Sequence, residues 1–204
     1  MTEATDTGEP FSDQLERWLR SDATKTLGAL GDVFAEKSFA VTILLLMFVP
    51  GLPLPTGGIS HVFEAITIVL AGQMVLGQRT IWLPERWQHR ELGPTTTAKA
   101  IPFMIRWIRR VERFSRPRGA RLFDEDWMLR LLGLVVMAFA IGAAIAPPFS
   151  GLDTLPSLGA VLVALAIILD DVVVLAIGAV IGTGGILLIL TIGAAIVRIL
   201  RNLV

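Results

Sequence analysis

Residues 38–76 read SFAVTILLLMFVPGLPLPTGGISHVFEAITIVLAGQMVL, and this stretch decides how the remaining chain is arranged. Two apolar segments, residues 39–49 and 59–76, flank a proline- and glycine-rich break at residues 50–58. Both segments are too apolar to face water, so each is predicted to form a helix buried in protein or in lipid. The prolines lack an amide donor and disfavour helix for the residue before them, so the break separates the two helices.

The break has two alternative interpretations. Irregular backbone at membrane depth persists only where protein or a water-filled cavity surrounds it, and in transporters such interruptions hold an ion or substrate. The path would then be lined by Pro50, Pro53, Pro55 and Gly58. Alternatively, the break is an ordinary turn in the headgroup region. The first segment is shorter than the about 20 residues that span a bilayer, so it either extends toward the N-terminus or forms a re-entrant hairpin with the second.

The composition places the chain in the membrane class. Hydrophobic residues make up 53% of the sequence, and the mean hydropathy of +0.68 is high for a soluble domain. With no cysteine and two histidines, we expect no metal site and no cofactor. The predicted fold is all-α, an integral membrane bundle of about four to six hydrophobic helices with Pro/Gly-interrupted, re-entrant pairs and amphipathic surface helices.

The chain is predicted to form a single membrane domain over residues 11–204, after a disordered tail at residues 1–10. Residues 38–77 would form a first helical hairpin, residues 78–129 a basic cytoplasmic segment, and residues 130–204 a second helical group. The polar N-terminal stretch lacks the apolar core of a signal peptide. We therefore expect the spans themselves to bring the protein into the bacterial inner membrane.

Residues 11–36 carry an amphipathic pattern. Leu15, Trp18 and Leu19 share one face at helical spacing. One or two helices are predicted here. They either lie on the membrane surface or pack as a cap on the protein's own loops.

Basic residues concentrate between the two hydrophobic groups. Twelve of the 18 Lys and Arg residues fall within residues 79–130, although the formal net charge of the chain is zero. An excess of basic residues marks cytoplasmic loops, so this segment is predicted to be cytoplasmic in a multi-pass protein.

Residues 98–114 form the amphipathic part of this basic segment, with apolar residues at i, i+3 and i+4 spacing. Such a helix is typical of a membrane surface rich in anionic lipid, and a tryptophan after an apolar segment favours the interface. No nucleic-acid-binding fold accompanies the basic residues, so nucleic acid is not an expected partner. The predicted lipid-contacting residues are Trp82, Arg106, Arg109, Arg110, Arg113 and Arg118.

The pattern of apolar helix, proline-glycine break and apolar helix occurs twice, at residues 39–76 and at residues 133–171. Transporters are often built from such repeats, with the site where interrupted segments meet. Gene duplication without a transport role is the alternative. The last apolar run, residues 172–199, is predicted to be interrupted at residues 182–185, which read GTGG.

Asp170 and Asp171 are the sharpest chemical feature of the second half. A carboxylate at membrane depth marks an ion, proton or substrate path, whereas at a membrane face the pair would be a solvated turn. Gln73 and Asp171 are the predicted polar groups of a path. Glu64 and Gln73 are nine positions apart on opposite sides of a helix, so they are not expected to form one site by themselves.

Several motifs together resemble the ExoD family of bacterial membrane proteins. These are residues 47–55 with Gly58-Ile59-Ser60, Gln73 with Gly77, Trp82-Leu83-Pro84, residues 113–118 (RFSRPR), and an Asp after a proline-rich break and an apolar run. The resemblance covers residues 22–197. The family usually has an Asp-Gly pair near the last span, and here Val172 follows Asp171 in place of the glycine.

The resemblance implies an association with exopolysaccharide synthesis and, through it, with symbiosis and alkaline tolerance in rhizobia. It implies no assigned catalytic residues. The first hypothesis is an inner-membrane protein that supports exopolysaccharide synthesis by moving an ion, a small solute or a lipid-linked intermediate. The second is an accessory or regulatory subunit that docks to polysaccharide-synthesis machinery through residues 98–118. The third and weakest is a membrane enzyme with Asp170, Asp171 or Glu64 as acid or base. The sequence leaves the oligomeric state open.

Overall fold

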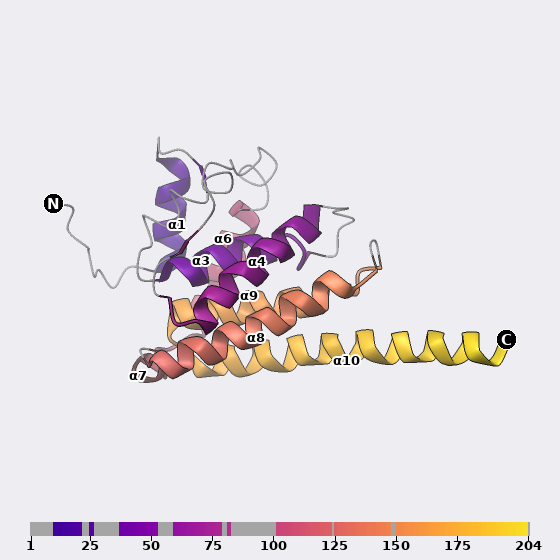
Figure 1. Ribbon diagram of the computed structural model, residues 1–204. Helices are drawn as coiled ribbons and strands as arrows, with labels where there is room; N and C mark the ends of the chain where they lie inside the picture. Colours follow the sequence, from indigo (N-terminus) through magenta and orange to yellow (C-terminus); the bar gives the residue numbers. More distant parts are fainter. Residues whose placement is uncertain are drawn as a thin grey trace.

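The computed structural model describes residues 10–21, 25–26, 37–52, 59–78, 81–82, 101–123, 125–147 and 150–203. Within these ranges the structure has eight α-helices and no β-strand, and Figure 1 shows how the helices are arranged. They are α1 (Phe11–Arg20), α3 (Ser38–Phe48), α4 (Ile59–Val75), α6 (Ile101–Glu112), α7 (Ala120–Phe123), α8 (Asp126–Ile145), α9 (Thr154–Leu169) and α10 (Val172–Leu203). The predicted all-α class is confirmed for this part of the chain.

Helix α3 is the centre of the structure. All 11 of its residues are buried, and none is charged. A helix that is apolar all round can only be stable when other elements surround it. Helices α4 and α9 pack directly on α3.

Four helices form a bundle in the cyclic order α3, α4, α8, α9. Helix α8 packs on α4 and α9, the same two helices that flank α3. Lys37, just before α3, reaches the carbonyl of Ile168 near the end of α9, so α3 and α9 are antiparallel. Gly77, just after α4, lies against the Arg130 guanidinium near the start of α8, so α4 and α8 are also antiparallel.

Both proline-glycine breaks lie at the same end of this bundle. Leu158 in the first turns of α9 reaches Gly51 after α3, where a Cβ atom would lie 3.4 Å from Leu158 Cδ2. We call this the break end (residues 49–52, 59–64, 146–147 and 150–157), and we call the other the charged end (Lys37, residues 73–78, 115–123, 125–130 and 169–173). The two helix–break–helix repeats therefore run in the same direction, as in transporters built from parallel repeats.

Helix α10 is a single helix of 32 residues, about 48 Å long, and it extends beyond the bundle toward the C-terminus (Figure 1). The interruption predicted at residues 182–185 is wrong. A Cβ atom at Gly159 of α9 would lie only 2.4 Å from Gly182 Cα, so the glycines allow the two helix backbones to touch. Gly185 lies against Pro156 of α9 and Gly182 also lies against Phe139 of α8, so these two glycines serve helix packing and do not break the helix.

The amphipathic helices α1 and α6 pack on each other and cover the bundle. Phe11, Leu15 and Trp18 of α1 are buried. The buried residues of α6 are Ile101, Met104, Ile105 and Ile108, and the Phe103 ring lies 6.0 Å from the ring of Phe48 at the end of α3. The apolar face of α6 therefore points into the protein.

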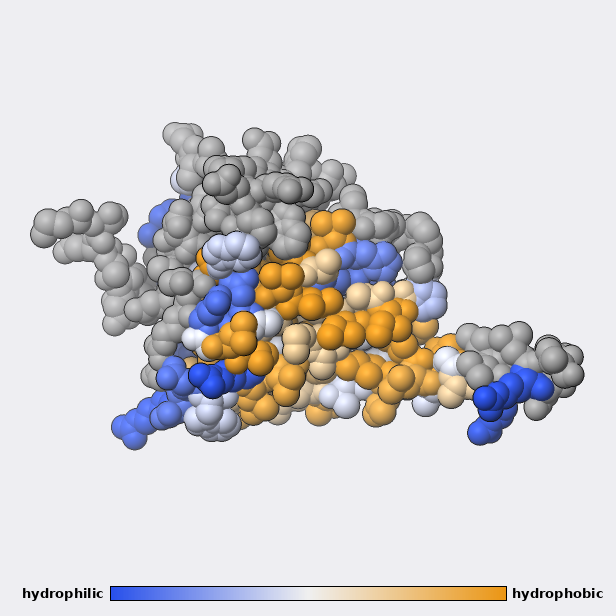
Figure 2. Space-filling model, in the orientation of Figure 1, coloured by the Kyte–Doolittle hydropathy of each residue, from blue (hydrophilic) through white to orange (hydrophobic). Residues whose placement is uncertain are grey.

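Two helices are long and apolar enough to cross a membrane, α8 over Asp126–Ile145 and α10 over Val172–Ala195. Only 39% of the first and 22% of the second apolar window is buried within the chain. Figure 2 shows apolar side chains along this side of the molecule, with hydrophilic residues toward both ends. The exposed large side chains of α8 and α10 include Leu131, Leu134, Ile141, Ile145, Ile177, Val180, Leu187 and Leu190.

Candidate functional site

The break end holds a fully buried carboxylate. Glu64, in the second turn of α4, has no exposed surface. Its Oε2 atom lies 2.8 Å from His61 Nδ1, one turn earlier on the same helix. The His61 side chain is 38% exposed, so the pair connects the protein interior to the surface. The second carboxylate oxygen, Oε1, has no hydrogen-bond partner among the described residues.

Further buried hydroxyls lack partners in the described part of the chain. Thr67 Oγ1 lies one turn along α4 from Glu64, and Ser157 Oγ lies one turn along α9 from Asp153. Asp153, the residue before α9, lies at the same end of the bundle as Glu64. Thr42 Oγ1 of α3 is also buried and unpaired.

Unpaired buried polar atoms are rare in folded proteins, and each costs about 1–3 kcal/mol. An unpaired carboxylate oxygen, with an unpaired hydroxyl one turn along the same helix, indicates a site that is completed by a proton, an ion, water or a ligand. No group of three or more metal-ligating side chains was found in the described ranges. A single carboxylate with nearby hydroxyls suits a proton or a monovalent cation better than a transition metal.

At the charged end, Asp171 caps α10. Its carboxylate accepts hydrogen bonds from the Val173 amide (2.9 Å), the Arg116 amide (3.0 Å) and the Ser115 hydroxyl (2.9 Å). Burial by itself would raise the pKa of Asp171, but these three hydrogen bonds and the nearby Arg118 charge hold the pKa below its ordinary value. Asp171 therefore joins the start of α10 to the segment that follows α6.

Asp170 has a different role from its neighbour. Its backbone is left-handed, with φ of 52°, and its carboxylate forms an ion pair of 2.8 Å with Lys37 Nζ. Its carbonyl accepts a hydrogen bond from the Gly119 amide. The two adjacent aspartates bind different partners, so they do not form one site.

Gln73 is also committed to a structural contact. The side chain is 7% exposed, its Nε2 donates to the Trp82 carbonyl, and its Oε1 accepts from the Trp82 amide, both at 2.7 Å. The exposed indole of Trp82 is thus attached to the end of α4.

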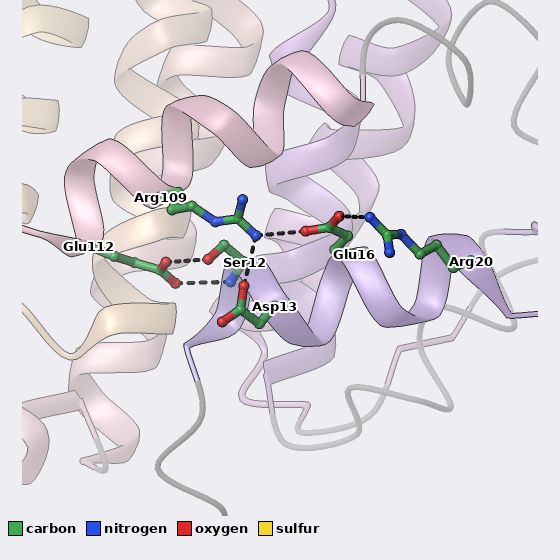
Figure 3. A network of polar contacts seen from close by, with 6 residues as sticks. All are labelled: Ser12, Asp13, Glu16, Arg20, Arg109 and Glu112. Carbon is green, nitrogen blue, oxygen red and sulfur yellow. Dashed lines mark hydrogen bonds and ion pairs between the residues drawn. The ribbon is translucent and has the colours of Figure 1, made fainter.

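A charged network joins α1 to α6 (Figure 3). Arg109 Nη2 donates to Asp13 (2.7 Å) and to Glu16 (2.6 Å), and Glu16 also pairs with Arg20. Glu112 accepts hydrogen bonds from the amide and the hydroxyl of Ser12. The hydrogen bond from Arg109 lowers the pKa of Glu16.

The predicted site residues thus separate into distinct places. Pro50 lies in the turn after α3 at the break end. Pro53, Pro55 and Gly58 lie outside the described residues. Apart from Trp82 and Arg109, the predicted lipid-contacting residues are arginines of α6 and of the segment after it, and their side chains are exposed. Arg106 lies over the Phe103 ring at 5.9 Å, and Arg110, Arg113 and Arg118 are exposed. That these arginines contact lipid stays a prediction.

The pairing of His61 with Glu64 was missed from the sequence. The two residues were weighed singly, the histidine for metal binding and the glutamate as an acid or base. Their i, i+3 spacing was the available signal, because residues three apart meet on a helix surface. That Glu64 faces inward and His61 outward depends on how α8 packs on α4, which no local pattern reports.

The family profile described as "Exopolysaccharide synthesis, ExoD" matches residues 11–191. The chain belongs to the ExoD family. The resemblance found in the motifs is confirmed, and the profile spans every described helix except the end of α10.

Two relatives of this ExoD-family chain are similar over most of its length. Protein ExoD of Rhizobium meliloti (strain 1021) is 31% identical over 157 residues, which cover 72% of this chain and 62% of that protein. Uncharacterized protein slr1875 of Synechocystis sp. (strain ATCC 27184 / PCC 6803 / Kazusa) is 26% identical over 148 residues, which cover 72% of this chain and 69% of that protein. No solved structure matches the chain.

Proposed function

We propose that this chain is a multi-pass protein of the bacterial inner membrane that supports exopolysaccharide synthesis by moving an ion, a small solute or a lipid-linked intermediate. The observation that carries the proposal is at the break end. There the bundle brings the regions of both proline-glycine breaks together beside Glu64, which is fully buried and has an unpaired oxygen. Breaks that meet at a buried polar group are how transporters build sites.

The surface supports placement in a membrane. The outward sides of α8 and α10 carry large apolar side chains, which a water-soluble monomer rarely exposes in such number. The cations gather at the other end of the bundle, where Arg113, Arg116, Arg118, Arg121 and Arg130 lie close in sequence. By the charge rule this end faces the cytoplasm and the break end faces outward.

Gln73 and Asp171 remain part of the proposed path, at its cytoplasmic side. Both already carry hydrogen bonds, so each must exchange partners if it contacts a moving solute. Glu64 needs no such exchange at its free oxygen, and we place the principal polar group of the path there.

Cysteine accessibility tests this arrangement, and the absence of native cysteines makes the labelling clean. Single cysteines would be placed at Leu52 and Gly57 of the first break, at Arg121 of the charged end, and at Gly184, which has open space around it on α10. In intact cells we expect the break positions to react with a membrane-impermeant thiol reagent and Arg121→Cys to react only after lysis. Gly184→Cys, facing lipid, should react slowly in both. Labelling of both ends from one side would contradict the proposal.

The role in exopolysaccharide synthesis is tested separately, in a bacterium whose own family gene is deleted. We expect the wild-type chain to restore secreted polysaccharide and the Glu64→Gln variant, present at the same level in the membrane, to fail. Full restoration by Glu64→Gln would remove Glu64 from the function.

The second candidate is an accessory subunit of the polysaccharide-synthesis machinery. One observation favours it. Because the apolar face of α6 is buried in the protein, its outer side presents exposed Arg106 and Arg110 to an acidic partner or to lipid headgroups. Changing Arg106 and Arg110 together to Gln would then abolish polysaccharide production, and transport catalysed by the purified protein alone would contradict this candidate.

A further inference from the structure

We propose that His61 and Glu64 form a proton-exchange site that opens toward the break end of the bundle. The proposal rests on the membrane placement given above. The bound species is a proton, which passes between the Glu64 carboxylate and the His61 imidazole. The proposal starts from the contact between Glu64 Oε2 and His61 Nδ1, at 2.8 Å.

Among the described residues, few groups near Glu64 could balance its charge. On its own helix the neighbour is His61. Asp153, before the start of α9, carries a charge of the same sign as Glu64, so it cannot balance that charge. Helix α8 packs on α4, but Arg130 lies against Gly77, thirteen positions from Glu64 and about 20 Å along the helix. Lys37 is paired with Asp170 at that same distant end.

A charged carboxylate costs far more in apolar surroundings than a neutral acid does. Glu64 has one oxygen against His61 and one oxygen without a partner in the described part of the chain. Binding a proton removes the uncompensated charge without needing any further ligand. A proton is therefore the occupant that these residues fit best.

His61 supplies the route between the buried acid and water. Its side chain is 38% exposed while that of Glu64 is 0% exposed. In release, the Glu64 carboxyl O–H gives its proton to Nδ1 of the neutral imidazole, leaving a carboxylate beside an imidazolium. The imidazolium then loses its Nε2 proton to water and becomes neutral, and uptake is the reverse. Histidine suits this step because its charge changes near neutral pH.

Infrared difference spectroscopy of the whole protein in lipid nanodiscs tests the site without requiring transport. We expect the wild-type protein to show the carbonyl-stretch band of a protonated carboxylic acid at neutral pH, and Glu64→Gln to lack it. Glu112→Gln removes a glutamate that is hydrogen-bonded to Ser12 and should leave the band unchanged. If Glu64→Gln does not fold, Glu64→Asp keeps the acid and should shift the band. A band that survives Glu64→Gln, or no band at neutral pH, would overturn the proposal.

His61→Gln tests the route. The Glu64 band should remain, but its response to a pH jump should slow at least tenfold, and an unchanged rate would exclude His61 as the carrier.

Proteoliposomes with an internal pH-sensitive dye separate the two proposals. A Glu64 band without proton movement would leave the site intact and contradict transport. Solute movement that is independent of Glu64 would contradict the proton site alone.

Discussion

The two ends of the bundle treat buried polar groups in opposite ways. At the charged end, the buried side chains of Asp171 and Gln73 are hydrogen-bonded to backbone groups of neighbouring segments. At the break end, Glu64 and Ser157 each keep a buried oxygen without a partner in the described residues, and so does Thr67, one turn further along α4. Paired polar groups hold a fold together, whereas unpaired ones cost free energy and persist where function needs them.

The comparison also separates the predicted residues. Gln73 and Asp171, predicted for a path, lie where polar groups are already paired. Glu64, which the sequence offered only for the weakest hypothesis, lies where they are not. Polar residues at the charged end should therefore contribute mainly to stability, and polar residues at the break end mainly to function.

The largest loss of stability is expected for Asp171→Ala. The change leaves two backbone amides and the Ser115 hydroxyl without their acceptor and removes the cap of α10. The expected cost is about 2–4 kcal/mol, measured by thermal unfolding in detergent micelles. Asp170→Asn is the matched control. It keeps a residue that tolerates positive φ and loses only a partly exposed ion pair, so it should cost no more than about 1 kcal/mol. Equal losses for the two variants would contradict the distinction drawn between them.

Acid should destabilise the protein through the same residue. The folded pKa of Asp171 is held below its ordinary value, because its hydrogen bonds outweigh the effect of burial. Such a group contributes stability above the unfolded pKa of about 3.9 and loses it as the pH falls through the folded pKa. The melting temperature should fall below about pH 4 in the wild type, and Asp171→Asn should show a smaller fall. Parallel pH curves for the two proteins would argue against this role.

Gln73→Leu should cost about 1–3 kcal/mol, because both backbone groups of Trp82 lose their partner. Gln78→Leu, an exposed glutamine just beyond the same helix, should stay within about 0.5 kcal/mol of the wild type. Thermal unfolding of the two variants makes the comparison. A neutral Gln73→Leu would show that the contact with Trp82 is dispensable.

Glu64→Leu, at the break end, should change the free energy of unfolding in the opposite direction. Removing a buried polar group that lacks a full set of partners should leave stability unchanged or raise it by about 1 kcal/mol, while polysaccharide production is lost. Unfolding and complementation measured on one variant would show this trade of stability against function. A loss as large as that of Asp171→Ala would mean that Glu64 is a structural residue.

The smallest effect is expected for Arg109→Gln in the network between α1 and α6. These ion pairs face solvent and are screened by salt, so the change should lower the melting temperature slightly at low salt and not at high salt. Arg110→Gln, on the exposed side of the same helix, provides the control. A large, salt-independent loss would place the network among the main supports of the fold.

The sequence predicted the elements whose causes are local. The apolar runs became α3, α4, α8 and α9, the prolines separated them, and the periodic residues of the basic segment became α6. Family membership was also available from short motifs, because these depend only on the order of residues along the chain.

The tertiary structure alone decided which elements meet. Hydropathy identified α3, α4, α8 and α9, but the bundle order and the common end of both breaks depend on contacts between distant segments. The glycines at 182–185 read as an interruption from sequence, yet their lack of side chains is what lets α9 approach a continuous α10. An apolar stripe likewise predicts that one face of a helix is buried, but it does not say what covers that face. The apolar face of α6 is covered by the protein itself. Glu64 became distinctive only when packing removed it from water and left one oxygen without a partner.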